Sequence, residues 1–404
     1  MLLLLSSAIS AFAQDSLHVR QLGIYGPPGF AWAVAVSGNY AYVADNQSGL
    51  RVVDITNPSS PVEAGFYDTP GYAQGVAVSG NYAYVADGGS GLRVVNITNP
   101  SSPVEAGFYD TPGDAYGVAV SGNYAYVADN QSGLRVVNIT NPSSPVEAGF
   151  YSTPGWAIGV AVSGNYAYVA DDYMGLRVVN ITNPSSPVSA GFYDTPGHAV
   201  DVAVSGNYAY VVDYNYGLRV VNITNPAAPW EVGFYDTPGW AEGVAVSGNY
   251  AYVADGNGLR VINIANPSSP VEVGYYDTPG DAVDVAVSGS IACLAERTYF
   301  STYDISFFAS ADPPRLLPFS TGLTIYPNPL NPSGVIVMEL ARRGVVKVEV
   351  FDVLGRRAAN IAQGVFEAGH HELPFDARAL PTGIYFVQMQ TAEQMVTRKA
   401  VVIK

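Results

Sequence analysis

The chain contains very little cysteine, histidine and charge. Cys293 is the single cysteine among 404 residues, so no intramolecular disulfide is possible, and we expect this residue to be a small part of the core. Charged residues make up only 13% of the chain, and its four histidines form no metal-ligand pattern. No stretch has the apolar spacing of a helix over about 10 residues. The composition therefore disfavours a disulfide scaffold, a helical bundle and a metal centre, and we expect no cofactor.

Lysine is missing from residues 1–321, which hold nine arginines and 27 acidic residues, a net charge of −18. Such an acidic surface disfavours binding to nucleic acids or to anionic membranes. Residues 322–404 instead hold nine basic and seven acidic residues, a net charge of +2. This change, with the proline-containing stretch before it, predicts domains at 14–310 and 322–404 joined by a linker at 311–321.

Long apolar runs are also scarce. The exception begins with Leu2–Leu5 and ends in Ala11-Phe12-Ala13, which has the form of a signal-peptidase site. We therefore expect a signal peptide at residues 1–13, too short to span a bilayer as a mature helix. No other segment is long and apolar enough for a transmembrane span, so the sequence predicts an exported protein.

Repetition is what the chain has in abundance. The segment Ser-Gly-Asn-Tyr-Ala-Tyr-Val-Ala-Asp recurs almost unchanged every 42 residues, and the last spacing is 41. The copies begin at Ser37, Ser79, Ser121, Ser163, Ser205 and Ser247, and a degenerate copy begins at Ser288. Repeats of this length indicate a propeller, a solenoid or a linear array.

One repeat, residues 71–110, contains four short runs rich in Val and Tyr. The runs are Gly75–Val78, Tyr82–Ala86, Leu92–Ile97 and Val104–Tyr109. Gly, Asn, Ser and Pro separate them, which is the pattern of strands joined by turns. Four antiparallel strands per repeat predict one blade of a β-propeller, with a β-helix as the alternative.

The two ends of the array predict a closed ring. Residues 18–26 match only a fourth strand, whereas the last repeat supplies three strands near 283–287, 291–295 and 299–305. The N-terminal strand would then complete the seventh blade and remove the open sheet edges. Residues 313–319 are the competing candidate for that place.

Charged residues recur at fixed places in every repeat. An acidic residue closes each second strand, an arginine begins each third strand, and a glutamate lies early in most fourth strands. The acidic series is Asp45, Asp87, Asp129, Asp171, Asp213, Asp255 and Glu296; the arginines are Arg51, Arg93, Arg135, Arg177, Arg219 and Arg260; the glutamates are Glu63, Glu105, Glu147, Glu231 and Glu272. We expect the acidic series to accept N–H bonds from the turn that follows, with a calcium ring as the alternative. The arginines and glutamates are expected to pair across strands, worth a few tenths of a kcal/mol each.

The repeats differ mainly in two connections: the one that enters each first strand and the one between the second and third strands. In an up-and-down blade both lie at the same end, so ring closure gathers them on one face. Ten residues define this predicted variable face: Phe30, Trp32, Tyr72, Asp114, Tyr116, Trp156, His198, Trp240, Glu242 and Asp281. Aromatic rings among carboxylates suit a glycan or a protein loop, so we predict a non-catalytic binding or adhesion module.

Two alternatives to a binding face remain open. The variable residues are also compatible with packing between blades and drift after duplication, in a purely structural surface protein. An extracellular polysaccharide hydrolase or lyase would use Asp114, His198, Glu242 or Asp281, although no catalytic set is evident. We expect a monomer without enzymatic activity.

The third strand of each repeat reads like Leu50-Arg51-Val52-Val53-Asp54-Ile55, with asparagine in place of Asp54 in later copies. This pattern resembles the LVIVD-repeat family, whose members form propeller-like proteins, mostly in secreted or surface settings. The resemblance covers about residues 16–306 and implies a fold rather than a reaction.

The C-terminal part reads as a small β-sandwich of alternating strands joined by Gly and Asn turns. Its segments are Tyr326-Pro327-Asn328-Pro329, Phe351-Asp352-Val353-Leu354-Gly355-Arg356, residues 380–387 and residues 399–404. In this order they look like the C-terminal sorting domain of type IX secretion, which is related in fold to immunoglobulin-like modules. That resemblance implies the secretion machinery as a partner and release from, or attachment to, the outer cell surface.

Overall fold

The computed structural model describes residues 16–309, 322–326, 333–340, 344–366, 369–391 and 395–403. The chain divides into two compact units, and the division falls between Ala309 and Ser310. Within the described residues, no helix has the length and apolar character that a membrane crossing requires.

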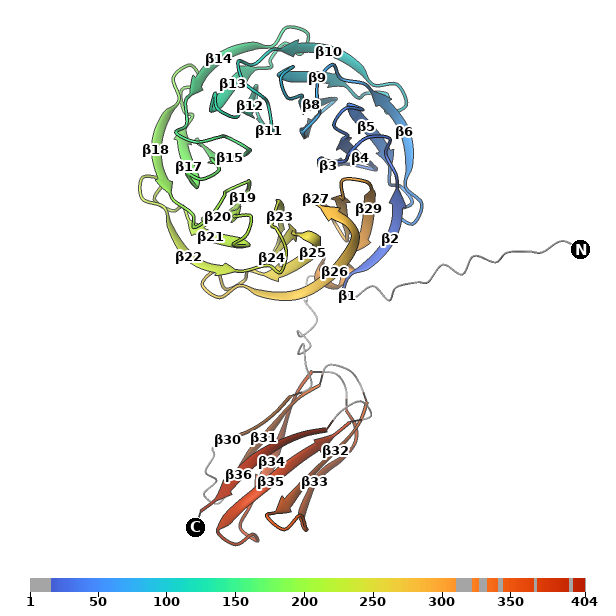
Figure 1. Cartoon of the computed structure of the whole chain (residues 1–404), viewed down its shortest axis with the longest axis vertical. Helices are drawn as coiled ribbons and strands as arrows, with labels where there is room; N and C mark the ends of the chain where they lie inside the picture. Colours follow the sequence, from blue (N-terminus) through green and yellow to red (C-terminus); the bar gives the residue numbers. More distant parts are fainter. Residues whose placement is uncertain are drawn as a thin grey trace, which may run out of the picture. The chain divides into compact units, whose positions relative to one another are not determined.

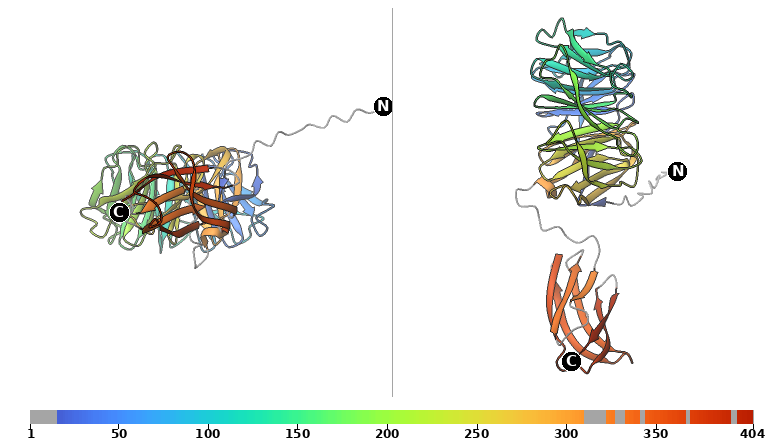
Figure 2. Two further views of the ribbon diagram at one scale, coloured as in Figure 1. Left: turned by 90° about the horizontal axis from the view of Figure 1, so that it is seen from below. Right: turned by 90° about the vertical axis from the view of Figure 1, so that its left-hand side faces the viewer.

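The first unit is a ring of seven antiparallel sheets around a central opening (Figure 1). Blade one contains β3 (Ala33–Ser37), β4 (Tyr40–Ala44), β5 (Leu50–Asp54) and β6 (Val62–Tyr67) in spatial order from the inside outward. Seen from the side, the ring is a short cylinder (Figure 2). The predicted all-β, seven-bladed propeller is confirmed.

Blades two to five repeat the same four-strand order. Their strands are β7 (Gly75–Ser79), β8 (Tyr82–Ala86), β9 (Leu92–Asn96), β10 (Val104–Tyr109), β11 (Gly117–Ser121), β12 (Tyr124–Ala128), β13 (Leu134–Asn138), β14 (Val146–Tyr151), β15 (Gly159–Ser163), β16 (Tyr166–Ala170), β17 (Leu176–Asn180), β18 (Val188–Tyr193), β19 (Asp201–Ser205), β20 (Tyr208–Val212), β21 (Leu218–Asn222) and β22 (Trp230–Tyr235). In each of these blades the third and fourth strands are out of step by one residue, a β-bulge that bends the outer strand.

The last two blades include the N-terminal strands. Blade six contains β23 (Gly243–Ser247), β24 (Tyr250–Ala254), β25 (Gly256–Asn263) and β26 (Val271–Ala282), with β1 (Ser16–Leu17) as a fifth strand on its outer edge. Blade seven contains β27 (Asp284–Ser288), β28 (Ile291–Ala295), β29 (Phe300–Asp304) and β2 (Arg20–Tyr25).

The ring is closed by β2, as predicted. It pairs with β29 so that Arg20 lies opposite Asp304 and Tyr25 lies opposite Phe300. The competing segment at 313–319 lies outside the described residues. The sequence did not predict β1, nor the short helix α1 (Ser306–Ala309) that follows β29.

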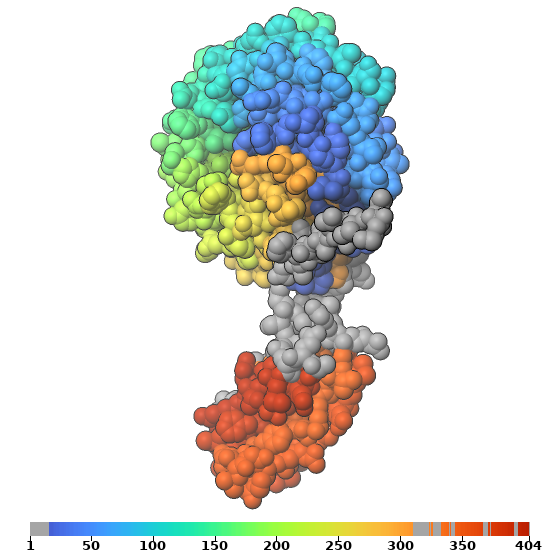
Figure 3. Space-filling view, turned by 45° about the vertical axis from the view of Figure 1, so that its right-hand side comes forward, coloured from blue at the N-terminus to red at the C-terminus, as the bar shows by residue number. Residues whose placement is uncertain are grey.

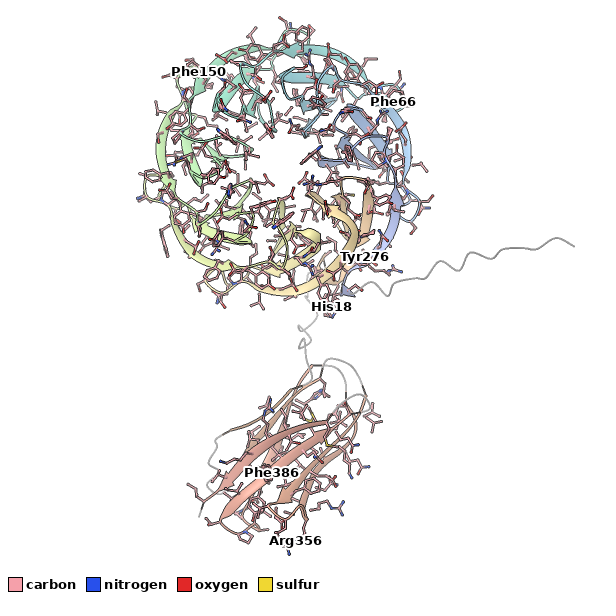
Figure 4. The ribbon with its side chains drawn as sticks, viewed as in Figure 1. His18, Phe66, Phe150, Tyr276, Arg356 and Phe386 are labelled. Carbon is pink, nitrogen blue, oxygen red and sulfur yellow. The ribbon has the colours of Figure 1, made fainter. Side chains whose placement is uncertain are left out.

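The two ends of the ring meet on blade six. The His18 ring stacks on Phe307 with the centroids 4.0 Å apart, and its Nδ1 lies 3.0 Å from the carbonyl oxygen of Val273. Phe308 of α1 packs edge-on to Tyr250. His18 is labelled beside this blade in Figure 4. These contacts hold both ends of the ring against the same sheet.

The propeller core lies between neighbouring blades. Seven apolar clusters fill the seven interfaces, and each combines one blade's inner strands with those of the next. Between blades one and two, for example, Tyr42 and Leu50 pack against Ala83, Val85 and Val95. Cys293 is fully buried in the cluster between blades seven and one, as expected for a small core residue. The space-filling view shows no break between the orange and blue blades at this junction (Figure 3).

The second unit is a sandwich of two antiparallel sheets. One sheet has the order β30 (Gly322–Tyr326), β31 (Ser333–Leu340) and β34 (Gly369–Asp376); the other has the order β33 (Arg357–Phe366), β32 (Gly344–Asp352), β35 (Gly383–Gln390) and β36 (Met395–Val402). Side chains from both sheets, including Ile336, Met338, Val348, Phe375 and Val387, form one buried core. This arrangement matches the predicted β-sandwich.

Candidate functional site

The variable connections of neighbouring blades are tied together by backbone hydrogen bonds. The alanine between the two variable positions of each connection is fully buried. In the connection into blade two, the Ala73 N–H donates to the Asn46 carbonyl, and the Asn46 N–H donates back to Ala73, both at 3.0 Å. Asn46 belongs to the turn between the second and third strands of blade one. The two kinds of variable loop therefore lie side by side on one face of the ring.

The second variable position of every repeat lines a cavity of about 430 Å³ at the central opening. The seven residues are Trp32, Gln74, Tyr116, Ile158, Val200, Glu242 and Val283. Tyr214, from the turn between β20 and β21, also lines the cavity. Each repeat thus contributes one side chain to the same wall, and the side chains differ in size, polarity and charge.

The first variable position of each repeat lies outside this cavity lining. Phe30, Tyr72, Trp156 and Trp240 are 49–57% exposed, and Asp114 and Asp281 are also exposed. Of the ten predicted site residues, the structure places Trp32, Tyr116 and Glu242 at the cavity. The other seven, Phe30, Tyr72, Asp114, Trp156, His198, Trp240 and Asp281, lie in the loops around it.

Four aromatic side chains form a continuous row across blades four to six. The Tyr173 ring lies 3.8 Å from the His198 ring, and His198 contacts Tyr214 edge-on at 6.1 Å. Tyr214 then stacks on Trp240 at 5.5 Å with the ring planes 19° apart. The His198 Nδ1 lies 2.8 Å from Asp172 Oδ1, which fixes the imidazole in this row. We call Tyr173, His198, Tyr214 and Trp240 the aromatic row.

Arg297 provides the positive charge beside the cavity. Its guanidinium lies over the Trp32 ring at 4.7 Å, and its Nη2 is 3.4 Å from Glu242. The same guanidinium is 3.6 Å from Asp281. Burial raises the pKa of Glu242 above its ordinary value, although Arg297 acts in the opposite direction. Glu242 is therefore an ion-paired side chain of the cavity wall rather than an isolated acid.

Two carboxylates in the cavity were missed by the sequence reasoning. Asp201 and Asp284 occupy the position directly after the second variable site and line the cavity. Their backbone partners lie in the next blade: the Val244 N–H donates to Asp201 at 3.1 Å, and the Val34 N–H donates to Asp284 at 2.8 Å. Burial raises the pKa of both carboxyls, and the negative charge of Asp201 raises the pKa of Asp284 further.

A signal for these two residues is present in the repeats. At the same position the other blades carry Ala33, Gly75, Gly117, Gly159 and Gly243. A Cβ added at Gly117 would lie 2.5 Å from the Ile158 carbonyl, so this position is crowded by the next blade. Aspartate therefore replaces glycine twice at a place where the fold favours a minimal side chain.

The regular acidic series has a structural role, but the predicted hydrogen-bond donor was wrong. Oδ2 of the aspartate accepts an N–H from a glycine in the connection that enters the same blade, at 2.8–3.1 Å, rather than mainly from the turn that follows it. The pairs are Gly29–Asp45, Gly71–Asp87, Gly113–Asp129, Gly155–Asp171, Gly197–Asp213 and Gly239–Asp255. The aspartates therefore anchor the variable connections to the sheet.

The repeated arginines are buried, whereas the expected energy of a few tenths of a kcal/mol per pair applies to solvent-exposed pairs. Arg93 Nη1 is 3.9 Å from Glu105, which is the expected cross-strand pair. Its Nη2 is also 3.3 Å from Asp110, its Nε is 3.7 Å from the buried Asp87, and its guanidinium stacks over Phe108 at 4.5 Å. The corresponding phenylalanines Phe66 and Phe150 are labelled on the outer rim in Figure 4. Removal of one partner from a buried, shared charge of this kind costs more than the loss of a surface pair, because it leaves an uncompensated charge in the interior.

The described residues combine apolar and acidic side chains at the cavity. Among them, no group of three or more His, Cys, Asp or Glu side chains is placed to hold a metal ion. The cavity instead combines aromatic and aliphatic walls with carboxylates that accept hydrogen bonds. Such a lining can hold a ligand through ring stacking and a few directed polar contacts.

Comparisons with known proteins agree with this architecture. The LVIVD repeat model matches residues 28–69, 70–111, 112–153, 154–195, 196–237, 238–278 and 279–310. A model described as a secretion system C-terminal sorting domain matches residues 324–404. A search of curated proteins gives no match.

Solved structures that resemble the chain are similar in fold alone. One is the β-propeller domain of Cps50 (Swd1) from Myceliophteria thermophila, with a TM-score of 0.56 and 11% identity over 71% of this chain and 99% of that one. Another is the computationally designed Ika8 protein, with a TM-score of 0.53 and 11% identity over 70% of this chain and 99% of that one.

Proposed function

This chain belongs to the LVIVD-repeat family, and from that premise we propose that it is an exported, non-catalytic module that binds a ligand on its variable-loop face. Its C-terminal sorting domain implies export by type IX secretion, to the cell surface or outside the cell. Attachment at the outer surface and the binding itself belong to the proposal.

The observation that carries the proposal is convergence. Six nearly identical repeats and one degenerate repeat each place their second variable residue in one cavity, while the turns at the opposite end hardly vary among the six. Random substitution after duplication would spread the differences between repeats over both ends of the blades. Variation concentrated in the residues around one cavity is what a ligand-binding surface on a rigid scaffold requires.

The chemistry of this face supports a glycan best. The aromatic row presents ring faces, with Tyr173 66% exposed and Trp240 57% exposed, and sugar rings stack on such faces. The carboxylates Asp201, Glu242 and Asp284 in the adjoining cavity can accept hydrogen bonds from sugar hydroxyls. A protein loop is the other ligand class that such a surface accommodates. A binding screen that contains both glycans and surface proteins separates the two classes.

The test is a glycan and surface-protein binding screen with the purified chain, followed by substitution. Trp240→Ala and Trp156→Ala should each weaken binding about 30-fold, equivalent to about 2 kcal/mol, because large aromatic anchors dominate recognition surfaces. The matched control is Trp230→Ala, since Trp230 is 56% exposed but lies on the outer strand β22. Equal binding by all three variants and the parent would refute the proposed face.

An enzyme remains the second candidate function because of one observation, the pair Asp201 and Asp284. Two carboxyls with raised pKa values in one cavity resemble the acid and base of a polysaccharide hydrolase or lyase. Of the earlier candidates, only Glu242 lines that cavity. Turnover of a polysaccharide that is abolished by Asp201→Asn and Asp284→Asn would establish this function, and binding without turnover would exclude it for the substrates tested.

A further inference from the structure

The turn between β32 and β33 exposes two large apolar side chains. Leu354 is 72% exposed and Val353 is 64% exposed, and Leu354 is the most exposed large apolar residue in the part of the chain that the structure describes. Displaying such side chains to water is unfavourable unless another surface covers them. Together with further apolar neighbours, such a turn would form a candidate contact surface.

The turn is held in one conformation by Asp352. Its Oδ1 accepts the N–H groups of Leu354 and Arg356, both at 2.9 Å, and its Oδ2 pairs with Arg356 Nε at 2.8 Å. Gly355 has a φ of 76°, which glycine adopts without strain. A tip that is already ordered loses little conformational entropy when it binds.

Neighbouring strands extend this apolar tip into a patch. Phe351 lies opposite Phe386, and Asp352 lies opposite Tyr385, so the chain enters the turn next to Ile384. Directly opposed residues share one face of a sheet, and residues two apart on a strand also share a face. Phe386 and Ile384 are 39% and 44% exposed on that face. We call Phe351, Val353, Leu354, Ile384 and Phe386 the tip patch.

Basic residues surround the tip patch. Arg356 lies in the turn and Arg357 begins β33; their side chains are 73% and 61% exposed and pair with Asp352 and Glu349. Lys399 lies opposite Phe386 on β36, so the border of the patch keeps a net positive charge. Figure 4 labels Arg356 at one end of the sandwich and Phe386 within its sheet. The sorting region carries a net charge of +2, whereas residues 1–321 carry −18. A receptor with an acidic rim would attract this module and repel the propeller.

We infer that the tip patch is the surface by which the type IX export machinery grips this module, through an apolar pocket with an acidic rim on one of its protein components. The match to a sorting domain supplies the partner, and the exposed apolar tip with its basic border supplies the chemistry. The inference does not depend on the ligand of the propeller.

The test is export of the full chain in a bacterium that possesses the machinery. The double variant Val353→Asp with Leu354→Asp should lower the amount that reaches the cell surface or medium about tenfold or more, because two charges would enter an apolar pocket. The matched control is Val345→Asp with Val365→Asp. These two residues are both 60% exposed and lie opposite each other on β32 and β33, away from the tip patch. The control should be exported within about twofold of the parent.

Folding is checked separately, by thermal unfolding of each purified full-length variant. A second pair, Val353→Ser with Leu354→Ser, removes the apolar contacts without adding charge and should also reduce export. Normal export of a folded tip variant would overturn the inference, and so would an equal loss in the control pair. Trp240→Ala should lose ligand binding but keep normal export, because the variable-loop face and the tip patch belong to different units.

Discussion

At the scale of single residues, the repeated arginines are the main polar element of the propeller. Each is buried between an aspartate that closes the second strand and an aromatic ring of the outer strand. The arrangement has three negative partners around one guanidinium in blades one and two, at 3.1–4.0 Å. Because arginine presents several donors in a planar fork, it can satisfy these partners together.

We predict that Arg93→Met destabilises the propeller by about 3–5 kcal/mol, since it leaves the fully buried Asp87 without its cation. Arg20→Met is the control, because the Arg20 side chain is 73% exposed and pairs with Asp304 at the surface. That change should cost less than about 1 kcal/mol. Chemical unfolding followed by tryptophan fluorescence measures both, since all four tryptophans lie in the first unit. Similar losses for the two variants would contradict this account.

The identity of such residues was readable from the sequence, but their partners were not. Regular spacing identified the aspartate and arginine series, and their structural role is confirmed. The glycine that donates to Asp45 lies 16 residues earlier, and no local turn rule points to it. Asp201 and Asp284 were not among the predicted site residues, because they replace glycine at the start of a strand and carry no loop or turn signal. Their shared position becomes visible only after the repeats are aligned at the residue after the second variable site.

At the scale of strands, closure depends on how β2 meets blade one. A Cβ added at Gly23 would lie 2.5 Å from the Pro58 carbonyl and would also collide with the Pro61 ring. Equivalent glycines, such as Gly65 and Gly107, face the proline turn of the next blade in the same way. Each proline turn therefore packs closely against the outer strand of the preceding blade and leaves no room for a side chain at that glycine.

We predict that Gly23→Ala lowers the stability of the propeller by about 1–3 kcal/mol, because backbone must move to admit the methyl group. Gly26→Ala is the control, since a Cβ there meets nothing within 4 Å. Urea unfolding midpoints give the comparison. If Gly26→Ala proves as costly as Gly23→Ala, close contact with blade one is not what limits this position.

Strand number and strand order were predictable because the same four-strand pattern recurs in each repeat. The closing role of the N-terminal strand was predictable because the last repeat lacks a fourth strand. The elements that occur once were not. β1 has two residues, and its partner strand β26 lies more than 250 residues away. α1 takes the place of the proline turn that other repeats carry, where Phe308 covers Gly274. Nothing in the local sequence predicts a helix of four residues there.

At the scale of the whole molecule, the ring carries many buried carboxyls. Burial raises the pKa of Asp45 to about 6 and the pKa of Glu296 to about 7, and it raises the pKa of the other members of the acidic series. A carboxyl with a higher pKa in the folded state binds its proton more tightly there than in the unfolded chain. Its stabilising effect is complete below pH 4 and is lost as the pH rises through 6 to 7.

The propeller should therefore melt at a higher temperature at pH 5.5 than at pH 8, and the reduced negative charge at pH 5.5 acts in the same direction. Each unit of pKa shift corresponds to about 1.4 kcal/mol, so the sum over several sites amounts to a difference of several degrees. Fluorescence-detected melting at constant ionic strength measures it, and Asp45→Asn should flatten the pH dependence. A melting temperature that is constant or rises between pH 5.5 and 8 would contradict the prediction.

Both ends of the ring are fastened to a single sheet: His18 contacts Val273, Phe308 contacts Tyr250, and the His18 and Phe307 rings stack on each other. A circle whose start and finish adjoin has no obligatory first member. If a short peptide bridged Ser16 and Ala309, a new opening in any exposed proline turn would leave every blade with its four strands. A circularly permuted chain that begins in another proline turn should therefore form the same ring. Whole repeats can be inserted or deleted as long as the N-terminal strand still pairs with the last blade.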